Sequence, residues 1–251
     1  MTSPWDTAWD GCAAADLTCD IATLGLSEAL AADLRGQQRP VLIANGTGSA
    51  ALLQLQHEEA ASAFGMLHVT TRTPSGRIAT VPFERFLRSL RCSGDADDAY
   101  IFQPSGKLPA PLGQRVLAVA RGLSLLDSVY AQEATPAIAY LALGGGSAGL
   151  ALHRHTATAF AAQLHGRKRW VLAPPDCARD DGSCRVSCMQ KPGDILLVPR
   201  GWWHGTIGLD ASIAVVVHVY SRTRRGDLRL PPESPPPMEF SVGGSVAHPE
   251  L

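Results

Sequence analysis

The sequence predicts a mainly β domain of the jelly-roll kind, with flanking helices. From residue 138 onward, short apolar segments with strand character follow one another closely, and turn signals separate them. Before that point, stretches with helical periodicity alternate with single short strands. Many short strands with turns between them are typical of a sandwich or barrel, so we expect one β core with helices attached to it.

Length and composition fit one such domain. The 251 residues are 45% hydrophobic and 18% charged, which is enough for one sizeable core. The formal net charge of −1 argues against a general nucleic-acid binder or membrane-surface binder. No apolar run is long enough to cross a bilayer, so no membrane insertion is expected.

The first half of the chain predicts helices separated by short strands. Ser27 is expected to cap the first helix, because it precedes a run of helix formers that a glycine follows. The predicted helices cover residues 27–35, 50–64, 82–91 and about 114–120. The predicted strands of this half cover residues 39–43, 66–73 and 100–102.

The second half predicts the strands of the jelly roll itself. They are expected over residues 138–144, 150–155, 168–174, 194–199 and 212–220. The predicted organisation is an extended N-terminal arm over 1–20, one domain over 21–222 and a flexible tail over 223–251. We predict a flexible tail because its prolines prevent regular structure.

A pair of histidines marks the candidate metal site. His153 and His155 stand two residues apart in an apolar segment, and side chains at that spacing point to the same side of a strand. His204 follows another short apolar strand and a Pro-Arg-Gly turn, which makes it the expected third ligand. Neutral imidazole is the commonest metal ligand in proteins, and three ligands leave coordination positions open for chemistry.

Three segments resemble the JmjC or cupin-like branch of the iron(II) and 2-oxoglutarate oxygenases. They are GRKRWVLAPP at 166–175, KPGDILLVPRGWWH at 191–204 and SIAVVV at 212–217, within a resemblance that runs from about Leu24 to Tyr220. The resemblance implies a double-stranded β-helix with the metal in its mouth, and Fe(II) and 2-oxoglutarate as cofactors. That family usually has His-x-Asp or His-x-Glu. The His-x-His of this chain is similar to the subgroup of JmjC-domain-containing protein 8, whose animal members reside in the endoplasmic reticulum lumen.

The resemblance also implies residues for the cosubstrate. Lys168 matches the lysine that pairs with the distal carboxylate of 2-oxoglutarate in several JmjC hydroxylases, and Tyr100 matches a tyrosine that assists it. Alternation along the strand places Lys168 on the same face as Trp170, where a buried ammonium requires an anionic partner. The alternative is a lysine at a strand end that reaches water. Leu150 occupies the position where the family often has a threonine, so one carboxylate contact is missing.

The other histidines carry weaker signals. His218 lies on the last predicted strand, where it can adjoin the metal and cosubstrate or be an ordinary core histidine. We take His57, His68 and His165 as structural or exposed, and His248 lies in the predicted tail. We expect one of Trp202 and Trp203 to cover the core and the other to shield the mouth of the site.

Three functions fit these residues. The first is an oxygenase that uses Fe(II) and 2-oxoglutarate to hydroxylate a substrate such as a protein side chain. The second is a JmjC-like binding or scaffold protein without turnover, because His155 replaces a carboxylate. The third is a three-histidine cupin dioxygenase independent of 2-oxoglutarate. Lys168 favours the first function over the third, because an enzyme without 2-oxoglutarate has no need of that lysine.

Cysteine usage and the chain ends bear on the compartment. Cys177, Cys184 and Cys188 share one polar segment, where we expect free thiols or one local disulfide. The N-terminus lacks the basic start and apolar core of a signal peptide, which favours the cytoplasm. The last four residues, HPEL, resemble a retrieval signal and keep the endoplasmic reticulum lumen as the alternative. Asn45 is formally a glycosylation acceptor, but we expect an Asn-Gly turn there.

Overall fold

The computed structural model describes most of the chain between residues 19 and 220. The described ranges are 19–32, 34–47, 63–73, 77–90, 99–126, 137–146, 148–177 and 183–220. Nearly all of the predicted arm, most of the predicted helix over 50–64 and the predicted tail lie outside them, as do His57 and His248. None of the helices in these ranges has the length and apolar character needed to cross a membrane.

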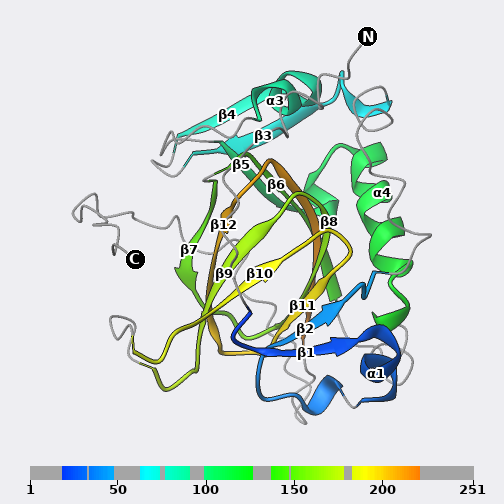
Figure 1. The fold of residues 1–251 in the computed structure, drawn as a ribbon. Coiled ribbons are helices and arrows are strands. Elements are labelled where there is room, and N and C mark those ends of the chain that lie inside the picture. The colour runs from blue at the N-terminus through cyan, green and yellow to red at the C-terminus, as the bar shows by residue number, and fades with distance from the viewer. Residues whose placement is uncertain are drawn as a thin grey trace, which may run out of the picture.

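Two β-sheets form the centre of the molecule (Figure 1). The larger sheet has the strand order β1-β2-β11-β8-β13-β6-β5-β3-β4, and the smaller has the order β10-β9-β12-β7. The strands of the larger sheet are β1 (Ala22–Gly25), β2 (Val41–Ala44), β3 (His68–Arg72), β4 (Ile78–Pro82), β5 (Tyr100–Pro104), β6 (Ala137–Gly144), β8 (Thr158–His165), β11 (Ile195–Val198) and β13 (Ser212–Val219). The strands of the smaller sheet are β7 (Gly149–His153), β9 (Lys168–Ala173), β10 (Val186–Gln190) and β12 (Trp203–Gly208). This arrangement confirms the predicted mainly β jelly-roll fold.

The centre of the larger sheet is buried on both faces, and β13 shows how. Its odd-numbered residues, including Val215 and Val217, belong to the core cluster that includes α4 (Ala110–Arg121). Its even-numbered residues Ala214 and Val216 belong to a second cluster, which also contains Trp170 and Leu172 of the smaller sheet. Successive side chains of a strand point to opposite faces, so a strand covered on both sides needs apolar residues throughout. This explains the continuous apolar run that made β13 predictable.

The observed helices lie near the predicted positions, but their lengths differ from the predicted lengths. The first is α1 (Leu26–Ala31), followed by the 3-10 turn η1 (Leu34–Gly36), instead of one helix over 27–35. The predicted cap Ser27 is wrong, because Gly25 is the N-cap residue and its N–H donates to Glu28 Oε2 at 2.7 Å. The helical elements that lie wholly within the described ranges also include α3 (Phe83–Ser89), η3 (Ser105–Lys107) and α4, which begins four residues before the predicted helix.

The strands that the sequence did not predict include β1, β8, β10 and β12, and β8 and β12 matter most for the site. β8 lies between β11 and β13 in the middle of the larger sheet. Its sequence TAFAAQLH is rich in alanine, a residue of low strand propensity, but burial between neighbouring strands overrides that propensity. β12 carries His204 as a strand residue, where we expected a loop. The smaller sheet therefore holds this histidine by a hydrogen-bonded ladder on both sides of β12.

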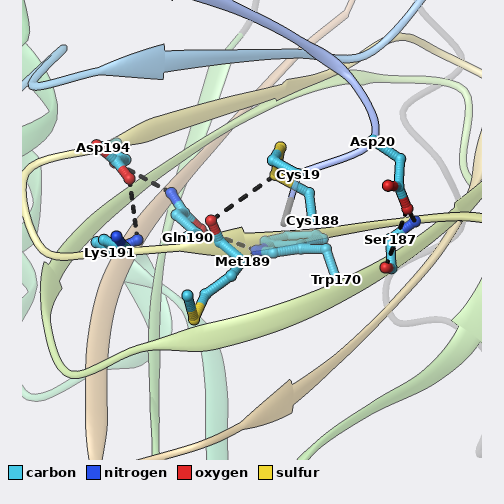
Figure 2. Close-up of a disulfide and its surroundings, with 9 residues drawn as sticks. All are labelled: Cys19, Asp20, Trp170, Ser187, Cys188, Met189, Gln190, Lys191 and Asp194. Atoms are coloured by element: carbon cyan, nitrogen blue, oxygen red, sulfur yellow. Dashed lines mark hydrogen bonds between the residues drawn. A yellow bond between two sulfur atoms is a disulfide. The ribbon is translucent and has the colours of Figure 1, made fainter. Parts of the chain in front are cut away.

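Two disulfides tie the described residues together. Cys177 pairs with Cys184, which confirms the expected local disulfide. Cys188 pairs instead with Cys19, which lies 169 residues earlier in the sequence. Next to this bond, Asp20 Oδ2 accepts hydrogen bonds from the N–H and the hydroxyl of Ser187 (Figure 2). The last two residues of the predicted arm are thus held against β10.

The Asn45-Gly46 segment is a turn, as predicted. Asn45 has a φ of 51°, in the left-handed region that asparagine tolerates better than most residues. Its N–H donates to Asp194 Oδ1 at 3.2 Å, and the Thr47 N–H donates to the Gly193 carbonyl at 3.1 Å. The turn after β2 therefore packs against the turn that precedes β11.

Candidate metal centre and cosubstrate site

Three histidines meet at one end of the smaller sheet. His153 ends β7, and the ladder between β7 and β12 pairs it with His204. His155 follows two residues later, beyond the strand, and its ring centroid lies 6.0 Å from that of His153 and 4.7 Å from that of His204. One ligand atom from each residue lies within 4.8 Å of the others, so the three residues could hold a metal ion.

The backbone fixes which ring nitrogen of each histidine faces the others. His153 Nδ1 lies 2.8 Å from the Ala151 carbonyl, His155 Nδ1 lies 3.0 Å from the Ala157 carbonyl, and His204 Nδ1 lies 2.9 Å from the Trp202 carbonyl. A carbonyl oxygen only accepts hydrogen bonds, so each Nδ1 must carry the proton. In a neutral ring the lone pair is then on Nε2, and His155 Nε2 is buried with no hydrogen-bond partner. Such an orientation of each ring by a backbone carbonyl is typical of metal ligands.

Burial keeps these rings neutral. It lowers the pKa of His155 to about 4, with a further contribution from the neighbouring His153. Burial likewise lowers the pKa of His153 and, more strongly, that of His204. At neutral pH the three rings therefore carry no protons on Nε2 that a metal would have to displace.

His218 adjoins this group as a fourth imidazole. It lies on β13, in the larger sheet, and is 7% exposed. Its ring centroid is 4.3 Å from that of His155 and 4.6 Å from that of Tyr140, which in turn stacks on Phe102. The structure thus places His218 beside the three histidines, as one of our two interpretations required, and burial lowers its pKa to about 3.

Lys168 lies inside the jelly roll, as the alternation predicted. It is the first residue of β9 and is 3% exposed, and Trp170 and Leu172 on the same face are also buried while Arg169 is exposed. The alternative of a strand-end lysine that reaches water is therefore wrong. Within the described part of the chain, no salt bridge joins Lys168 to an acidic residue, and burial lowers its pKa to about 7.

Tyr100 comes from the opposite sheet to meet Lys168. The Lys168 Nζ lies 5.6 Å from the centroid of the Tyr100 ring, and Thr206 interacts with the tyrosine hydroxyl and partly offsets the rise in its pKa. Gly144, opposite Tyr100 in the ladder, leaves room for the ring, because a Cβ there would lie 2.6 Å from Tyr100 Cδ2. Burial raises the pKa of the Tyr100 hydroxyl, so it stays protonated and can donate a hydrogen bond.

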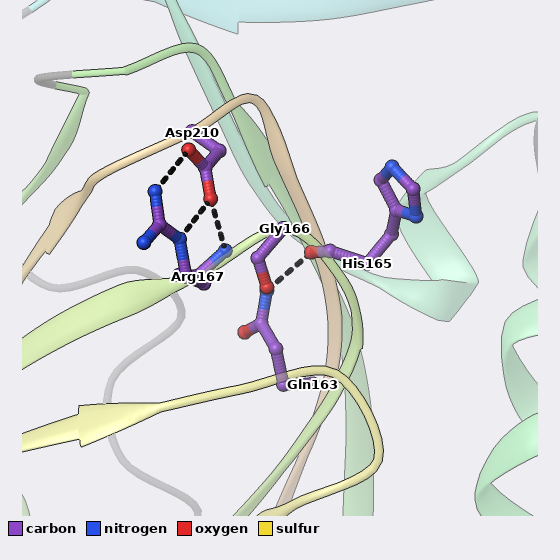
Figure 3. A network of polar contacts seen from close by, with 5 residues as sticks. All are labelled: Gln163, His165, Gly166, Arg167 and Asp210. Carbon is purple, nitrogen blue, oxygen red and sulfur yellow. Dashed lines mark hydrogen bonds and ion pairs between the residues drawn. The ribbon is translucent and has the colours of Figure 1, made fainter. Parts of the chain in front are cut away.

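An ion pair fixes the turn from which Lys168 enters the interior. Arg167 Nε donates to Asp210 Oδ2 at 2.6 Å, Nη2 donates to Oδ1 at 2.9 Å, and the Arg167 N–H also donates to this carboxylate (Figure 3). Behind the turn, Gln163 Nε2 donates to the Gly166 carbonyl at 3.1 Å, and Gly166 adopts a φ of 65°. No local sequence pattern indicated this ion pair, since its partners stand 43 residues apart.

β12 connects the metal end of the interior to the lysine end. His204 pairs with Leu172 of β9, and Gly208 pairs with Lys168. The two ends therefore lie four residues apart along the strand, or roughly 13 Å at about 3.3 Å per residue. Thr206 stands between them on the same face. Sequence reasoning missed Thr206, although counting two residues on from His204 would have found it.

The two tryptophans before His204 have different environments. Trp202 packs against the inner cluster and its Nε1–H donates to the Gln38 carbonyl at 2.9 Å. The guanidinium of Arg154 lies 4.6 Å from the centroid of Trp203. Arg154 is the residue between His153 and His155, so this contact helps to hold the His-x-His segment. Trp202 thus covers the core, as expected for one of the pair.

Known proteins resemble this chain in sequence and in fold. Residues 119–226 match the JmjC domain family. The arginine-specific demethylase JMJ22 of Arabidopsis thaliana is 29% identical over 35% of this chain and 24% of its own length. JmjC domain-containing protein 8 of Mus musculus is 29% identical over 32% of this chain and 36% of its own length, and ribosomal oxygenase 2 of Rattus norvegicus is 36% identical over 34% and 21%. The chain thus spans between 21% and 36% of the length of these relatives.

Solved structures give the same picture. YcfD, a ribosomal oxygenase from Escherichia coli, has the same fold with a TM-score of 0.54 over 83% of this chain and 53% of that one, at 16% identity. A structure of YcfD in complex with cobalt and succinic acid gives a TM-score of 0.51 at 17% identity, over 83% of this chain and 54% of that one. At this identity the likeness concerns the fold. With the match of residues 119–226 to the JmjC domain family and with the curated relatives, it confirms the resemblance to JmjC oxygenases seen in the sequence.

Proposed function

We propose that this chain is an Fe(II)- and 2-oxoglutarate-dependent oxygenase that hydroxylates a protein side chain. The observation that carries the proposal is a pair of sites in one interior. Three neutral histidines converge at one end of β12, and a buried lysine that pairs with no acidic side chain of the described residues lies at the other. The first suits a divalent metal and the second suits an anion.

His153, His155 and His204 would hold the iron. Each presents an Nε2 lone pair, and each Nδ1–H is already satisfied by a backbone carbonyl, so metal binding costs no proton and no ring rotation. The buried, partnerless Nε2 of His155 fits this role. When bound, Fe(II) with 2-oxoglutarate supplies the oxygen activation that a hydroxylation requires.

Lys168 and Tyr100 would hold the far carboxylate of 2-oxoglutarate, and His218 would border the cosubstrate beside the metal. A carboxylate next to Lys168 would compensate the cost of burying its charge and would raise its pKa from about 7. The complex of YcfD with cobalt and succinic acid supports 2-oxoglutarate as the cosubstrate, because succinic acid is what remains of 2-oxoglutarate after decarboxylation.

The substrate class rests on the relatives. They include an arginine-specific demethylase and a ribosomal oxygenase, whose names indicate protein substrates. Within the described residues, the net charge and the fold offer no feature that favours a nucleic acid. We therefore propose a protein side chain as the group hydroxylated.

His155 supports a second candidate, a JmjC-like metal-binding protein without efficient turnover. A carboxylate at this position would remove one unit of positive charge from the iron, and a third imidazole does not. If the imidazole limits turnover, His155→Asp should raise the formation of succinate in the absence of substrate. A wild-type protein already as active as the variant would argue against this second candidate.

Turnover of 2-oxoglutarate tests the oxygenase proposal. The Fe(II) protein is supplied with 2-oxoglutarate and oxygen, and succinate and oxygen consumption are measured together. We expect both for the wild type and neither for His204→Ala. A protein that binds iron and 2-oxoglutarate but forms no succinate in the wild type and in His155→Asp would leave only the binding function.

We further propose an oxidising compartment, the alternative to the cytoplasm that the N-terminus favoured. Two disulfides join the described cysteines, and such bonds persist in oxidising compartments. Alkylation of native-host extracts before and after reduction tests this. If Cys19 and Cys188 are alkylated without prior reduction, their thiols are free in the cell, and the cytoplasm becomes the favoured compartment.

A further inference from the structure

A short segment near the start of the described chain joins the two sheets. Residues 19–25, which we call the strap, begin at Cys19 and end with β1. Cys19 forms a disulfide with Cys188 of β10, which lies at one edge of the smaller sheet (Figure 2). The other end of the strap, β1, pairs with β2 at one edge of the larger sheet. The strap therefore runs from one sheet to the other.

The strap covers part of the interior that holds the candidate metal centre. Cys19 and Ile21 are partly buried and pack against the inner cluster, which includes Cys188 and Trp170. Asp20, between them, is exposed. This alternation is typical of an extended segment with one face towards the interior and the other towards solvent. The strap thus shields this part of the inner cluster from water.

Two kinds of contact hold the strap to β10. The Asp20 N–H donates to the Ser187 carbonyl at 2.9 Å, and Asp20 Oδ2 accepts the Ser187 N–H at 3.1 Å and its hydroxyl at 3.2 Å. The two side-chain hydrogen bonds are exposed, so water competes for the same groups and their net contribution is small. The disulfide is the covalent contact, and it decides whether the strap stays on β10.

β10 connects this attachment to the metal centre through Trp170. Cys188 pairs with Trp170 across the ladder between β10 and β9. The indole N–H of Trp170 donates to Gln190 Oε1 at 2.8 Å, and Gln190 Nε2 donates to the Ala161 carbonyl of the larger sheet at 2.6 Å. The ring centroid of Trp170 lies 6.4 Å from that of His204. One edge strand therefore positions an aromatic ring that adjoins a candidate metal ligand.

The two sulfur atoms of the disulfide differ in their access to solvent. Cys188 is 1% exposed, whereas Cys19 is only partly buried. A thiolate can therefore attack Cys19 Sγ, and Cys188 leaves as a thiolate that takes up a proton. The second thiol of a dithiol reductant then displaces Cys19 and closes the disulfide of the reductant. Two electrons and two protons pass to the protein, and the reductant is oxidised.

We propose that the Cys19–Cys188 bond is a redox switch: a dithiol that reduces it releases the strap from β10, loosens Trp170 beside His204 and weakens metal binding. Reoxidation by a disulfide restores the bond and the affinity. This inference goes beyond the oxygenase proposal, because it concerns how the metal is retained, and it rests on that proposal only for the metal site. The other disulfide joins Cys177 to Cys184 between β9 and β10, so it needs a control of its own.

Co(II) binding in the two redox states tests the switch. Co(II) reports its coordination by visible absorption, so the measurement does not depend on turnover. The wild type is reduced with dithiothreitol, which is removed by anaerobic gel filtration, and is then titrated beside the oxidised protein. Reduction should weaken Co(II) binding about 10-fold, as expected when a metal ligand loses its support, and should speed hydrogen exchange in β10. Oxidised glutathione should reverse both changes.

Two variants isolate the bond. Cys19→Ser leaves the buried Cys188 thiol of the reduced state, so it should bind Co(II) as weakly as the reduced wild type and should not respond to dithiothreitol. The double variant Cys177→Ser, Cys184→Ser lacks the other disulfide. It should bind Co(II) as the oxidised wild type does and should keep the response. If Cys19→Ser does not fold, the reversible cycle of the wild type and the response of the double variant carry the test.

Each outcome decides the proposal. Equal Co(II) affinity in the two redox states of the wild type overturns the switch and leaves the oxygenase proposal standing. A response that persists in Cys19→Ser, or a reduced wild type that unfolds and is not restored by oxidation, also overturns it. A wild type that binds no Co(II) in either state overturns the metal site of the proposed function as well. Reversible weakening that Cys19→Ser reproduces supports the switch.

Discussion

The two sheets of this domain differ in how far the faces of their strands are buried. The strands of the larger sheet that lie at its centre, β8, β11 and β13, are buried on both faces and consist mostly of apolar residues. In the smaller sheet, the first residues of β9 alternate between buried and exposed positions, as the contrast between Lys168 and Arg169 shows. One sheet is the scaffold, and the other presents chemistry from its single buried face.

The difference shows where function can be placed in a jelly roll. The smaller sheet supplies His153, His204, Lys168 and Thr206, and the larger sheet contributes Tyr100 and His218 from its inner face. Polar residues on the outer face of the larger sheet would instead enter the core that α4 covers. Substitutions on the outer face of the larger sheet and on the inner face of the smaller sheet should therefore separate stability from ligand binding.

The largest expected effect is on metal binding. His204→Ala removes one of three ligands from the smaller sheet and should abolish measurable Fe(II) binding by calorimetry under anaerobic conditions. His68→Ala, at an exposed position of β3, is the matched control and should bind iron as the wild type does. If His204→Ala retained wild-type affinity, the three-histidine site would be wrong.

The scaffold is tested by Phe160→Ala in β8. This ring is 1% exposed and belongs to the outer core, so its loss should lower the free energy of unfolding by about 3–5 kcal/mol. Chemical denaturation measures the change, and Arg169→Ala on the exposed face of β9 should cost far less. Equal costs for the two variants would contradict the division between the sheets.

From the lowered pKa of Lys168 we predict a pH dependence of stability. Its pKa is about 7 in the folded protein and about 10.4 in an unfolded chain, so between these values the unfolded state binds more protons. The stability of the ligand-free protein should therefore gain up to about 1.4 kcal/mol per pH unit from this group as pH rises above about 7.

Binding of 2-oxoglutarate should show the opposite trend. It requires the charged ammonium, so affinity should fall up to about tenfold per pH unit above about 7. Calorimetry in buffers of different ionisation enthalpy measures the accompanying proton uptake. Lys168→Met should remove both pH effects, and a variant that keeps them would assign the titration to another group.

The smallest expected effect comes from the clamp before β9. Asp210→Asn breaks a partly buried ion pair with Arg167 and should cost about 1–3 kcal/mol of stability. Because the clamp holds the turn next to Lys168, 2-oxoglutarate should bind more weakly while iron affinity is unchanged. Loss of iron binding in this variant would show that the two ends of the interior are not independent.

The sequence predicted those parts of this molecule that depend on local pattern. Alternation placed Lys168 inside, the apolar run of 212–217 predicted β13, and the i, i+2 spacing brought His153 and His155 together. The ligand set as a whole came with the family resemblance. In each case the signal lay within a few residues of the chain.

What escaped prediction depends on distant partners. β8 is alanine-rich, and only its position between β11 and β13 makes it a strand. The pairing of Cys19 with Cys188 and the clamp of Arg167 with Asp210 join residues far apart in sequence. Thr206 interacts with Tyr100, which lies on the other sheet and is distant in sequence. Pattern within a segment does not encode such contacts.

The central claim is that one interior holds a metal at its histidine end and a dicarboxylic 2-oxoacid that reaches its lysine end. Anaerobic titration with Fe(II), followed by 2-oxoglutarate, tests it most directly when the wild type is compared with Lys168→Ala. We predict one iron per chain for both proteins, and one 2-oxoglutarate per iron for the wild type with greatly weakened binding for the variant. Equal 2-oxoglutarate affinity in the two proteins, or failure of the wild type to bind iron, would contradict the account.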